Sequence, residues 1–233
     1  MKPLVSVFIP AYNEAGNLRH CVEVVLSKMG EMGVEAEALV VDDGSTDSTG
    51  TLADELAAQN PRVRVVHHDR NQGIGAAFCT AIPEARGEWM ILIPADLALH
   101  PDELRCYLEA TPQADIVVGL RSDRSDYTLL RKLVSWTNIH LIRSLFHMHL
   151  RQFQYISMYR MDALRGIKIE YWRSAFFLAE VLIKARDRGY RLVEVEIRYA
   201  PRVSGRPTGA KLKLVVRTVL DIFHFWMRRK FGV

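Results

Sequence analysis

Residues 5–14, VSVFIPAYNE, decide the fold, because a short apolar run passes directly into the polar sequence Tyr12-Asn13-Glu14. Three similar apolar runs follow, at Ala38–Val41, Val63–Val66 and Trp89–Ile93. Segments with helical character lie between them, at Asn17–Met29, Ser48–Gln59 and Gly75–Ala85. Continuous apolar strands separated by helices are typical of a parallel sheet that is covered on both faces. The sequence therefore predicts an α/β fold with a doubly wound, mostly parallel central sheet.

Carboxylates follow three of the four predicted strands, at the point where each strand ends. Glu14 follows the first strand, Asp42 and Asp43 the second, and Asp96 the fourth. Ligands of open α/β sheets bind beyond the carboxyl ends of the strands. Carboxylates gathered there repel one another unless a cation or a hydrogen-bonding ligand is present. We therefore expect Asp43 and Asp96 to contact a ligand, whereas Asp47 is expected to cap a helix.

The second half of the chain is less regular. Its predicted elements are the strands Asp115–Gly119 and Arg191–Tyr199 and the helices Leu129–His149, Ser174–Arg188 and about 211–230. No internal repeat, low-complexity tract or linker divides the chain. We expect one domain over residues 1–210, followed by a basic amphipathic helix over 211–233 that is either part of this domain or faces a membrane.

The composition is that of an ordinary soluble globular protein: 233 residues, of which 49% are hydrophobic and 25% charged. Disorder, collagen-like repeats and a pure coiled coil are therefore excluded. The net charge is +4, but residues 201–233 carry eight basic side chains and one acidic side chain. Positive charge confined to one segment indicates a local anionic partner and argues against a nucleic-acid-binding protein.

The three cysteines indicate the compartment. Cys21, Cys79 and Cys106 are widely spaced and form neither a metal-binding nor a disulfide pattern, which favours buried thiols in a reducing environment. No apolar stretch reaches the ~18 residues that a membrane span needs, and the first residues look like neither a signal nor a transit peptide. We expect a cytoplasmic protein, either in solution or peripheral on the cytoplasmic face of a membrane.

Three motifs carry a resemblance to a known family. Residues 5–14 (VSVFIPAYNE), 40–47 (VVDDGSTD) and 71–77 (NQGIGAA) resemble the inverting family 2 glycosyltransferases of GT-A fold. The second half is most similar to the dolichyl- and polyprenyl-phosphate sugar synthases, through Gly119-Leu120-Arg121, Arg131-x-x-x-Ser135, Gly189-Tyr190-Arg191 and Pro201-Arg202-x-x-Gly205. The resemblance implies a nucleotide-sugar donor, a divalent cation (Mg²⁺ or Mn²⁺) and a lipid-phosphate acceptor.

The resemblance also implies roles for the residues that follow the strands. The nucleotide would contact Pro10, Ala11, Tyr12, Glu14, Asp42, Asp43 and Ala95. Within this set, Tyr12 and Glu14 would line the base and ribose pocket, Asp43 would hydrogen-bond the base, and Asp42 would order the loop. Asp96 matches the last aspartate of the DxD motif, which binds the metal and the diphosphate.

The implied acceptor site is basic. Arg121, Arg131 and Arg202, with Ser135, would bind the acceptor phosphate, because a guanidinium group matches phosphate oxygens in pairs. Together with Asp96, these arginines form the expected catalytic set. An acceptor phosphate is already an anionic nucleophile, so no strong general base is required.

Several residues depart from the family pattern. Pro94 stands where the first aspartate of DxD is usual, and Ala98 where a glutamine is usual. The segment Arg151–Ile156 carries amides where the family often has aspartates, and Pro207 replaces a serine of the basic loop. Since a missing carboxylate weakens a cation site through both charge and coordination number, the sequence predicts a weak or incomplete metal site at Asp96.

Three functions remain open on this evidence. The first is an active transferase that makes a polyprenyl-phosphate-linked sugar. The second is a family member with a saccharide or small hydroxyl acceptor, which would need a general base. The third is a nucleotide-binding but catalytically silent relative that acts as a partner subunit, an alternative favoured by Pro94 and Ala98.

The final predicted helix has one polar stripe and a broad apolar surface. The stripe consists of Lys213, Arg217, Asp221, His224 and Arg228, and Arg229 and Lys230 follow directly. A helix of this kind can lie in the interface of an anionic bilayer. The alternatives are a core helix and a contact between two copies in a homodimer.

Overall fold

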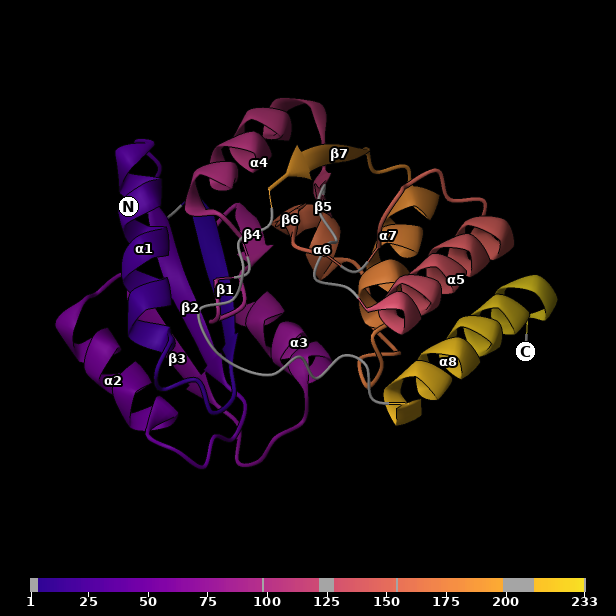
Figure 1. The fold of residues 1–233 in the computed structure, drawn as a ribbon. Helices are drawn as coiled ribbons and strands as arrows, with labels where there is room; N and C mark the ends of the chain where they lie inside the picture. Colours follow the sequence, from indigo (N-terminus) through magenta and orange to yellow (C-terminus); the bar gives the residue numbers. More distant parts are fainter. Residues whose placement is uncertain (1–3, 98, 122–127, 154, 199–211, 233) are drawn as a thin grey trace.

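A computed structural model describes residues 4–97, 99–121, 128–153, 155–198 and 212–232 (Figure 1). The strands are β1 (Val5–Ala11), β2 (Ala36–Asp42), β3 (Val63–His67), β4 (Trp89–Leu92), β5 (Ile116–Arg121), β6 (Ser157–Arg160) and β7 (Leu192–Ile197). The helices are α1 (Leu18–Glu31), α2 (Thr49–Gln59), α3 (Ile74–Glu84), α4 (Leu104–Ala110), α5 (Leu129–Phe146), α6 (Met161–Arg165), α7 (Phe177–Asp187) and α8 (Leu212–Phe231). Two short 3₁₀ helices, η1 (Pro101–Glu103) and η2 (Thr111–Gln113), flank α4.

The described strands form one sheet in the order β3-β2-β1-β4-β6-β5-β7. Strand β1 pairs in parallel with β2 on one side and with β4 on the other. The chain therefore winds outward from β1 to β3 and returns through α3 to β4, which creates a topological switch point between β1 and β4. The predicted doubly wound, mostly parallel sheet is confirmed.

Strand β6 is the one antiparallel element among the described strands. It lies between β4 and β5 and pairs with both in antiparallel fashion. The sequence does not predict it, because a strand of four residues is too short to show a periodic pattern. Its presence keeps β5 parallel to β1, so the carboxyl end of β5 lies at the same edge of the sheet as those of β1, β2 and β4.

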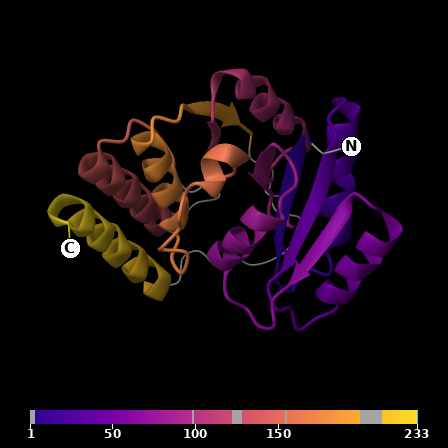
Figure 2. The same ribbon diagram turned by 180° about the vertical axis from the view of Figure 1, so that it is seen from behind.

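Helices cover both faces of the sheet, as the continuous apolar strands predict (Figures 1 and 2). On one face, Val7 and Ile9 of β1 belong to a cluster with buried residues of α1, α2 and α4. On the other face, Phe8 belongs to a cluster with buried residues of α3, α5, α6, α7 and α8. Alternate residues of β1 thus serve two separate hydrophobic layers.

Helix α8 is held to the body by aromatic packing. The Phe225 ring lies 5.5 Å from Phe146, 5.6 Å from Tyr171 and 5.4 Å from Phe176, measured between centroids. A hydrogen bond between the Tyr171 hydroxyl and His224 Nδ1, 2.9 Å long, lies beside this cluster. No helix of the described ranges combines the length and the apolar character that crossing a membrane requires.

Replacing Phe225 with alanine tests this anchorage. We expect Phe225→Ala to lower the free energy of unfolding by roughly 3–5 kcal/mol, because it removes a buried ring and leaves a cavity. Phe223, two residues earlier, is 42% exposed, so Phe223→Ala should cost less than about 1 kcal/mol. Urea denaturation measures both. Equal, small losses in the two variants would show that α8 does not pack on the core.

Candidate active site

The predicted ligand-binding segments meet at one edge of the sheet. Ala11 pairs with Asp42 in the β1–β2 register, and the Asp43 amide donates to the Ala11 carbonyl at 2.8 Å. On the other side of β1, the Ile93 amide donates to the Phe8 carbonyl at 2.9 Å, which places Asp96 just beyond the neighbouring strand end. This edge is the switch point, where open α/β sheets bind their ligands.

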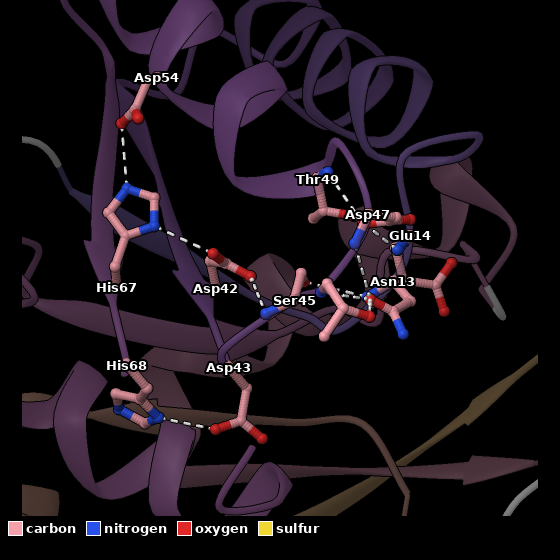
Figure 3. Close-up of polar contacts among 11 residues, drawn as sticks. Asn13, Glu14, Asp42, Asp43, Ser45, Asp47, Thr49, Asp54, His67 and His68 are labelled. Atoms are coloured by element: carbon pink, nitrogen blue, oxygen red, sulfur yellow. Dashed lines mark hydrogen bonds and ion pairs between the residues drawn. The ribbon is translucent and has the colours of Figure 1, made fainter. Parts of the chain in front are cut away.

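The loop after β1 interlocks with the loop after β2 (Figure 3). The backbone amide of Asn13 donates to Ser45 Oγ at 3.0 Å, and the side-chain oxygen Oδ1 of Asn13 accepts from the backbone amide of Thr46 at 2.8 Å. The Glu14 amide donates to Thr49 Oγ1 at 2.8 Å. These bonds hold Asn13 in a left-handed conformation with φ 55°. Tyr12, immediately before it, stays 44% exposed at the rim, a suitable position for a ring that lines a base pocket.

Asp47 joins the same two loops and has the expected capping role. Its carboxylate accepts the backbone amide of Thr49, the first residue of α2, at 2.9 Å, and also the Ala15 amide at 3.5 Å. Burial raises the pKa of Asp47, but the hydrogen bonds from Thr49 and Ala15 outweigh burial and leave the pKa below its usual value.

Asp43 fixes the loop that leads into α3. Its Oδ1 accepts a hydrogen bond from the backbone amide of Gln72 at 2.9 Å, and its Oδ2 accepts one from the backbone amide of Gly73 at 2.7 Å. His68 Nδ1 lies 2.7 Å from Oδ1. Gly44 allows this approach, since a Cβ there would lie 2.5 Å from the Arg70 Cα. Asp43 is almost fully buried, and its carboxylate therefore determines where the neighbouring loop lies.

His67 and His68 help to order the site, a role that the sequence alone does not predict. Histidines at a strand end are usually surface or core residues. His68 Nε2 also contacts Thr80 Oγ1 at 2.9 Å, so the ring connects Asp43 to α3. His67 Nδ1 contacts Asp42 Oδ2 at 3.0 Å and its Nε2 contacts Asp54 Oδ1 at 3.0 Å (Figure 3). Hydrogen bonds to Asp42 and then to Asp54 raise the pKa of His67.

Asp96 and Glu14 both act on one buried thiol. Cys21 of α1 donates to the Pro94 carbonyl at a sulfur–oxygen distance of 3.7 Å. Burial raises the pKa of the Cys21 thiol, and the negative charges of Asp96 and Glu14 raise it further. The two carboxylates, which come from different strand ends, therefore lie in one electrostatic environment at the site.

The described residues do not form a metal site by themselves. Among the residues that the structure describes, no group of three His, Cys, Asp or Glu side chains could hold a metal ion. Asp96 offers one carboxylate beside Pro94, and Ala98 lies outside the described residues. One carboxylate does not satisfy a hard cation that takes six or more oxygens, so a cation at Asp96 would need further oxygen ligands.

The predicted arginine cluster is only partly described. Arg121 ends β5 at the same sheet edge and is buried. The Gln152 side chain accepts from the Arg121 amide at 3.3 Å and donates to its carbonyl at 3.0 Å, so an amide of the atypical 151–156 segment holds the Arg121 backbone. Arg131 lies in the first turn of α5 and Ser135 one turn later. Arg202 lies outside the described residues.

A cleft of about 1020 Å³ lies at the opposite edge of the sheet. Ala36 at the start of β2, together with Arg62, Arg86 and Arg165, contributes to its lining. None of the motif carboxylates lies there, and ligands of this sheet type bind at the other edge. The carboxyl edge is therefore the better candidate.

Asp43→Ala removes the acceptor of two backbone amides, and a lost hydrogen bond to a charged group corresponds to about 1.5–3 kcal/mol. We expect hydrogen exchange at Gln72 and Gly73 to accelerate about tenfold or more. Asp47→Ala, which disturbs the other loop, should leave these two amides unchanged. Unaltered exchange in Asp43→Ala would contradict the assigned hydrogen bonds.

The charge of His67 should make the stability of the protein depend on pH. Because the pKa of His67 is raised above the ordinary 6.5, its charge contributes stability that is fully present below pH 6.5 and is lost as the pH rises through the folded-state pKa. The stability difference between wild type and His67→Gln should therefore be largest in acid. Urea denaturation across pH measures it, and NMR titration should show a lower His67 pKa in Asp54→Asn. A difference that grows with pH would refute the assignment.

Comparison with known proteins agrees with the motifs. The Glycosyl transferase family 2 profile matches residues 6–174. An undecaprenyl-phosphate mannosyltransferase of Micrococcus luteus is 30% identical over 211 residues, which cover 86% of this chain and 85% of that protein. The profile match spans residues 6–14 of the first motif and the whole of the second and third motifs.

Solved structures share the fold. Glucosyl-3-phosphoglycerate synthase of Mycobacterium tuberculosis, solved with Mn²⁺, UDP-glucose and phosphoglyceric acid, superposes with a TM-score of 0.73 at 18% identity, covering 96% of this chain and 80% of that one. The mannosyltransferase PcManGT of Pyrobaculum calidifontis, solved with GDP-Man and Mn²⁺, gives a TM-score of 0.66 at 20% identity, covering 98% and 65%. The sheet has the GT-A architecture of these neighbours, and the chain belongs to glycosyl transferase family 2 and is a glycosyltransferase.

Proposed function

We propose that this glycosyltransferase moves a sugar from a nucleoside-diphosphate donor to the phosphate of a polyprenyl lipid, with inversion at the anomeric carbon. The observation that carries the proposal is the similarity, along most of both chains, to the undecaprenyl-phosphate mannosyltransferase of M. luteus. The acceptor named there is a lipid phosphate. The topological switch point between β1 and β4 supports a donor site at that edge, because open α/β sheets bind their ligands there.

The donor half of the site consists of the residues that follow β1, β2 and β4. We assign the base and ribose to Tyr12 and Glu14, with Pro10, Ala11 and Ala95 as the apolar floor and Asp42 as a residue that orders the loop. The resemblance implies that Asp43 hydrogen-bonds the base, but its carboxylate oxygens are hydrogen-bonded to the amides of Gln72 and Gly73 and contact His68, so we assign Asp43 to loop ordering as well. The hydrogen bonds of Asn13, Glu14 and Asp43 support this assignment, because they fix the rim before any ligand arrives. A rim fixed in advance binds at a lower cost in conformational entropy.

Asp96 is the residue that we assign to the cation. A Mg²⁺ or Mn²⁺ ion held by Asp96 and by the diphosphate oxygens of the donor would neutralise charge on the leaving nucleoside diphosphate. The solved neighbours carry Mn²⁺ together with UDP-glucose or GDP-Man. Since the described residues hold no group of three metal-ligating side chains, we expect the cation to bind weakly unless the donor is present.

Acceptor chemistry requires no base from the protein. An acceptor phosphate oxygen forms a bond to the anomeric carbon as the bond from that carbon to the diphosphate oxygen breaks, and its electron pair leaves with the nucleoside diphosphate. We assign Arg121, Arg131, Ser135 and Arg202 to the acceptor phosphate. Charge-assisted hydrogen bonds from guanidinium groups position a phosphate nucleophile for attack from the opposite side.

Transfer of labelled sugar to a short polyprenyl phosphate tests the proposal. We expect product with one of a panel of UDP- and GDP-sugars, and a loss of about 10²-fold or more in Asp96→Asn, which removes charge from the diphosphate site. Nucleotide binding without transfer from any donor would favour the catalytically silent partner subunit, the alternative that Pro94 supports. Transfer only to hydroxyl acceptors would favour the saccharide-directed alternative.

A matched pair of variants tests the metal assignment. Pro94→Asp restores a second carboxylate beside Asp96, and Pro94→Asn is its uncharged control. We expect Mn²⁺ to strengthen nucleoside-diphosphate binding at least about tenfold more in Pro94→Asp than in wild type or the control, since charge count tunes cation affinity. Calorimetry with and without Mn²⁺ measures this. Strong Mn²⁺ dependence already present in wild type would contradict an incomplete site.

A polyprenyl phosphate acceptor lies in a membrane, so the proposal requires a surface through which the chain meets a bilayer. We place the protein peripherally on the cytoplasmic face. The basic C-terminal segment supports this location, because positive side chains are attracted to the anionic cytoplasmic leaflet.

A further inference from the structure

Helix α8 carries a continuous apolar stripe that points away from the core. The stripe consists of Val216, Leu220, Phe223, Met227 and Phe231, which are 49%, 63%, 42%, 46% and 57% exposed. They recur at spacings of four and three residues. At about 100° per residue they occupy a strip roughly 80° wide on the helix surface. The stripe is too regular and too exposed to be explained by scattered surface residues.

The opposite face of α8 is the one that packs. Thr218, Ile222 and Phe225 are buried, and Arg229 forms an ion pair with Asp187 of α7. Arg228 reaches Glu170 at 3.1 Å. Because these contacts fix the rotation of the helix about its axis, the apolar stripe is held facing outward. Figure 1 shows α8 at the margin of the molecule, next to α5 and far from α2.

Basic side chains border the stripe on both sides. By helical spacing of about 100° per residue, Lys213, Arg217 and Arg228 lie along one border and Lys230 along the other. The helix carries five basic residues, and its one acidic residue, Asp221, is within 4.0 Å of Arg217. The Lys230 ammonium lies 4.9 Å from the centre of the Trp226 ring, on the half-buried flank. An apolar strip between cationic borders matches a surface with apolar chains beneath anionic head groups.

Helix α5, which packs next to α8, exposes two further apolar side chains. Leu133 and Trp136 are 60% and 58% exposed, although α5 packs against α8 elsewhere through Phe146 and Phe225. Figures 1 and 2 show the two helices side by side from opposite directions. The Trp136 ring stacks on His140 with centroids 4.1 Å apart. Tryptophan is a side chain that favours the boundary between lipid and water.

We propose that the stripe on α8, supported by Leu133 and Trp136 of α5, rests in the head-group region of an anionic lipid bilayer, with the α8 axis parallel to the membrane plane. In this position the five stripe residues enter the boundary of the acyl chains, while Lys213, Arg217 and Lys230 remain at the level of the lipid phosphates. The packed face of α8 keeps the catalytic body on the aqueous side.

Charge favours a bilayer over a second copy of this chain. Two copies that met through the stripe would use the same patch twice, which brings the basic borders of one copy close to those of the other. The single acidic residue of the helix is half-buried and lies near Arg217, so it offers little compensation. Anionic lipids compensate all of the border charges.

Co-flotation with vesicles tests this surface without any substrate. The full chain is mixed with vesicles of phosphatidylcholine and phosphatidylglycerol that contain neither polyprenyl phosphate nor nucleotide sugar. We expect wild type to float at low salt, and Leu220→Glu/Met227→Glu to lose about tenfold or more in partition. Leu4→Glu, at an exposed apolar position just before β1, is the matched control and should float like wild type.

A second pair of variants tests the charged borders. Lys213→Gln/Lys230→Gln should weaken partition about tenfold and reduce its salt dependence, whereas Arg105→Gln on α4 should not. Wild type that stays in the soluble fraction at low salt would overturn the proposal. So would a stripe variant that floats like wild type, or sedimentation showing a dimer that Leu220→Glu/Met227→Glu separates while neither protein binds vesicles.

Far-UV circular dichroism and thermal unfolding establish that each variant is folded. Because the vesicles carry no acceptor, flotation tests the membrane surface separately from the proposed transfer reaction. Flotation without sugar transfer would support the membrane surface and contradict the proposed function. Sugar transfer to a short, water-soluble polyprenyl phosphate without flotation would support the proposed function and contradict the membrane surface.

Discussion

The hydrogen bonds of the Asp43 carboxylate are the interaction on which the arrangement of the site depends. They join the end of β2 to the amides of Gln72 and Gly73, immediately before α3 begins. Helix α3 returns the chain across β1 to β4, and that return creates the switch point. Gly44 and Gly73, with φ values of 68° and 92°, let the two loops come together where a side chain would be strained. One buried carboxylate thus shapes the rim of the site and the entry to the helix that completes it.

Much of the fold follows from pattern alone. The apolar runs from Val5 to Ile93 predict four parallel strands, because strands buried on both faces are apolar throughout. Strand β6 and the roles of His67, His68 and Gln152 do not follow, since they depend on contacts between residues far apart in the chain. Gln152 is an example: it appears in the sequence as a lost aspartate, and in the fold it holds the backbone of Arg121. Such a role becomes visible only when β5 and the 151–156 segment lie side by side.

The proposed donor site and the proposed membrane surface lie on different parts of the molecule. Carboxylates gather where β1, β2 and β4 end, whereas the net positive charge of the chain comes from its C-terminal segment. A helix with one apolar stripe and one packed face can hold the body at a fixed orientation to a surface. The donor site at the sheet edge then stays in water, which a charged nucleotide sugar requires.

We propose that the carboxyl edge of the sheet binds the donor. Hydrogen–deuterium exchange with and without the nucleoside diphosphate of the preferred donor tests it most directly. Protection of the amides at residues 11–14, 43–46 and 72–73 is the predicted result. Protection confined to the large cleft at the opposite edge, around residues 33–37, 61–62 and 85–86, would contradict it.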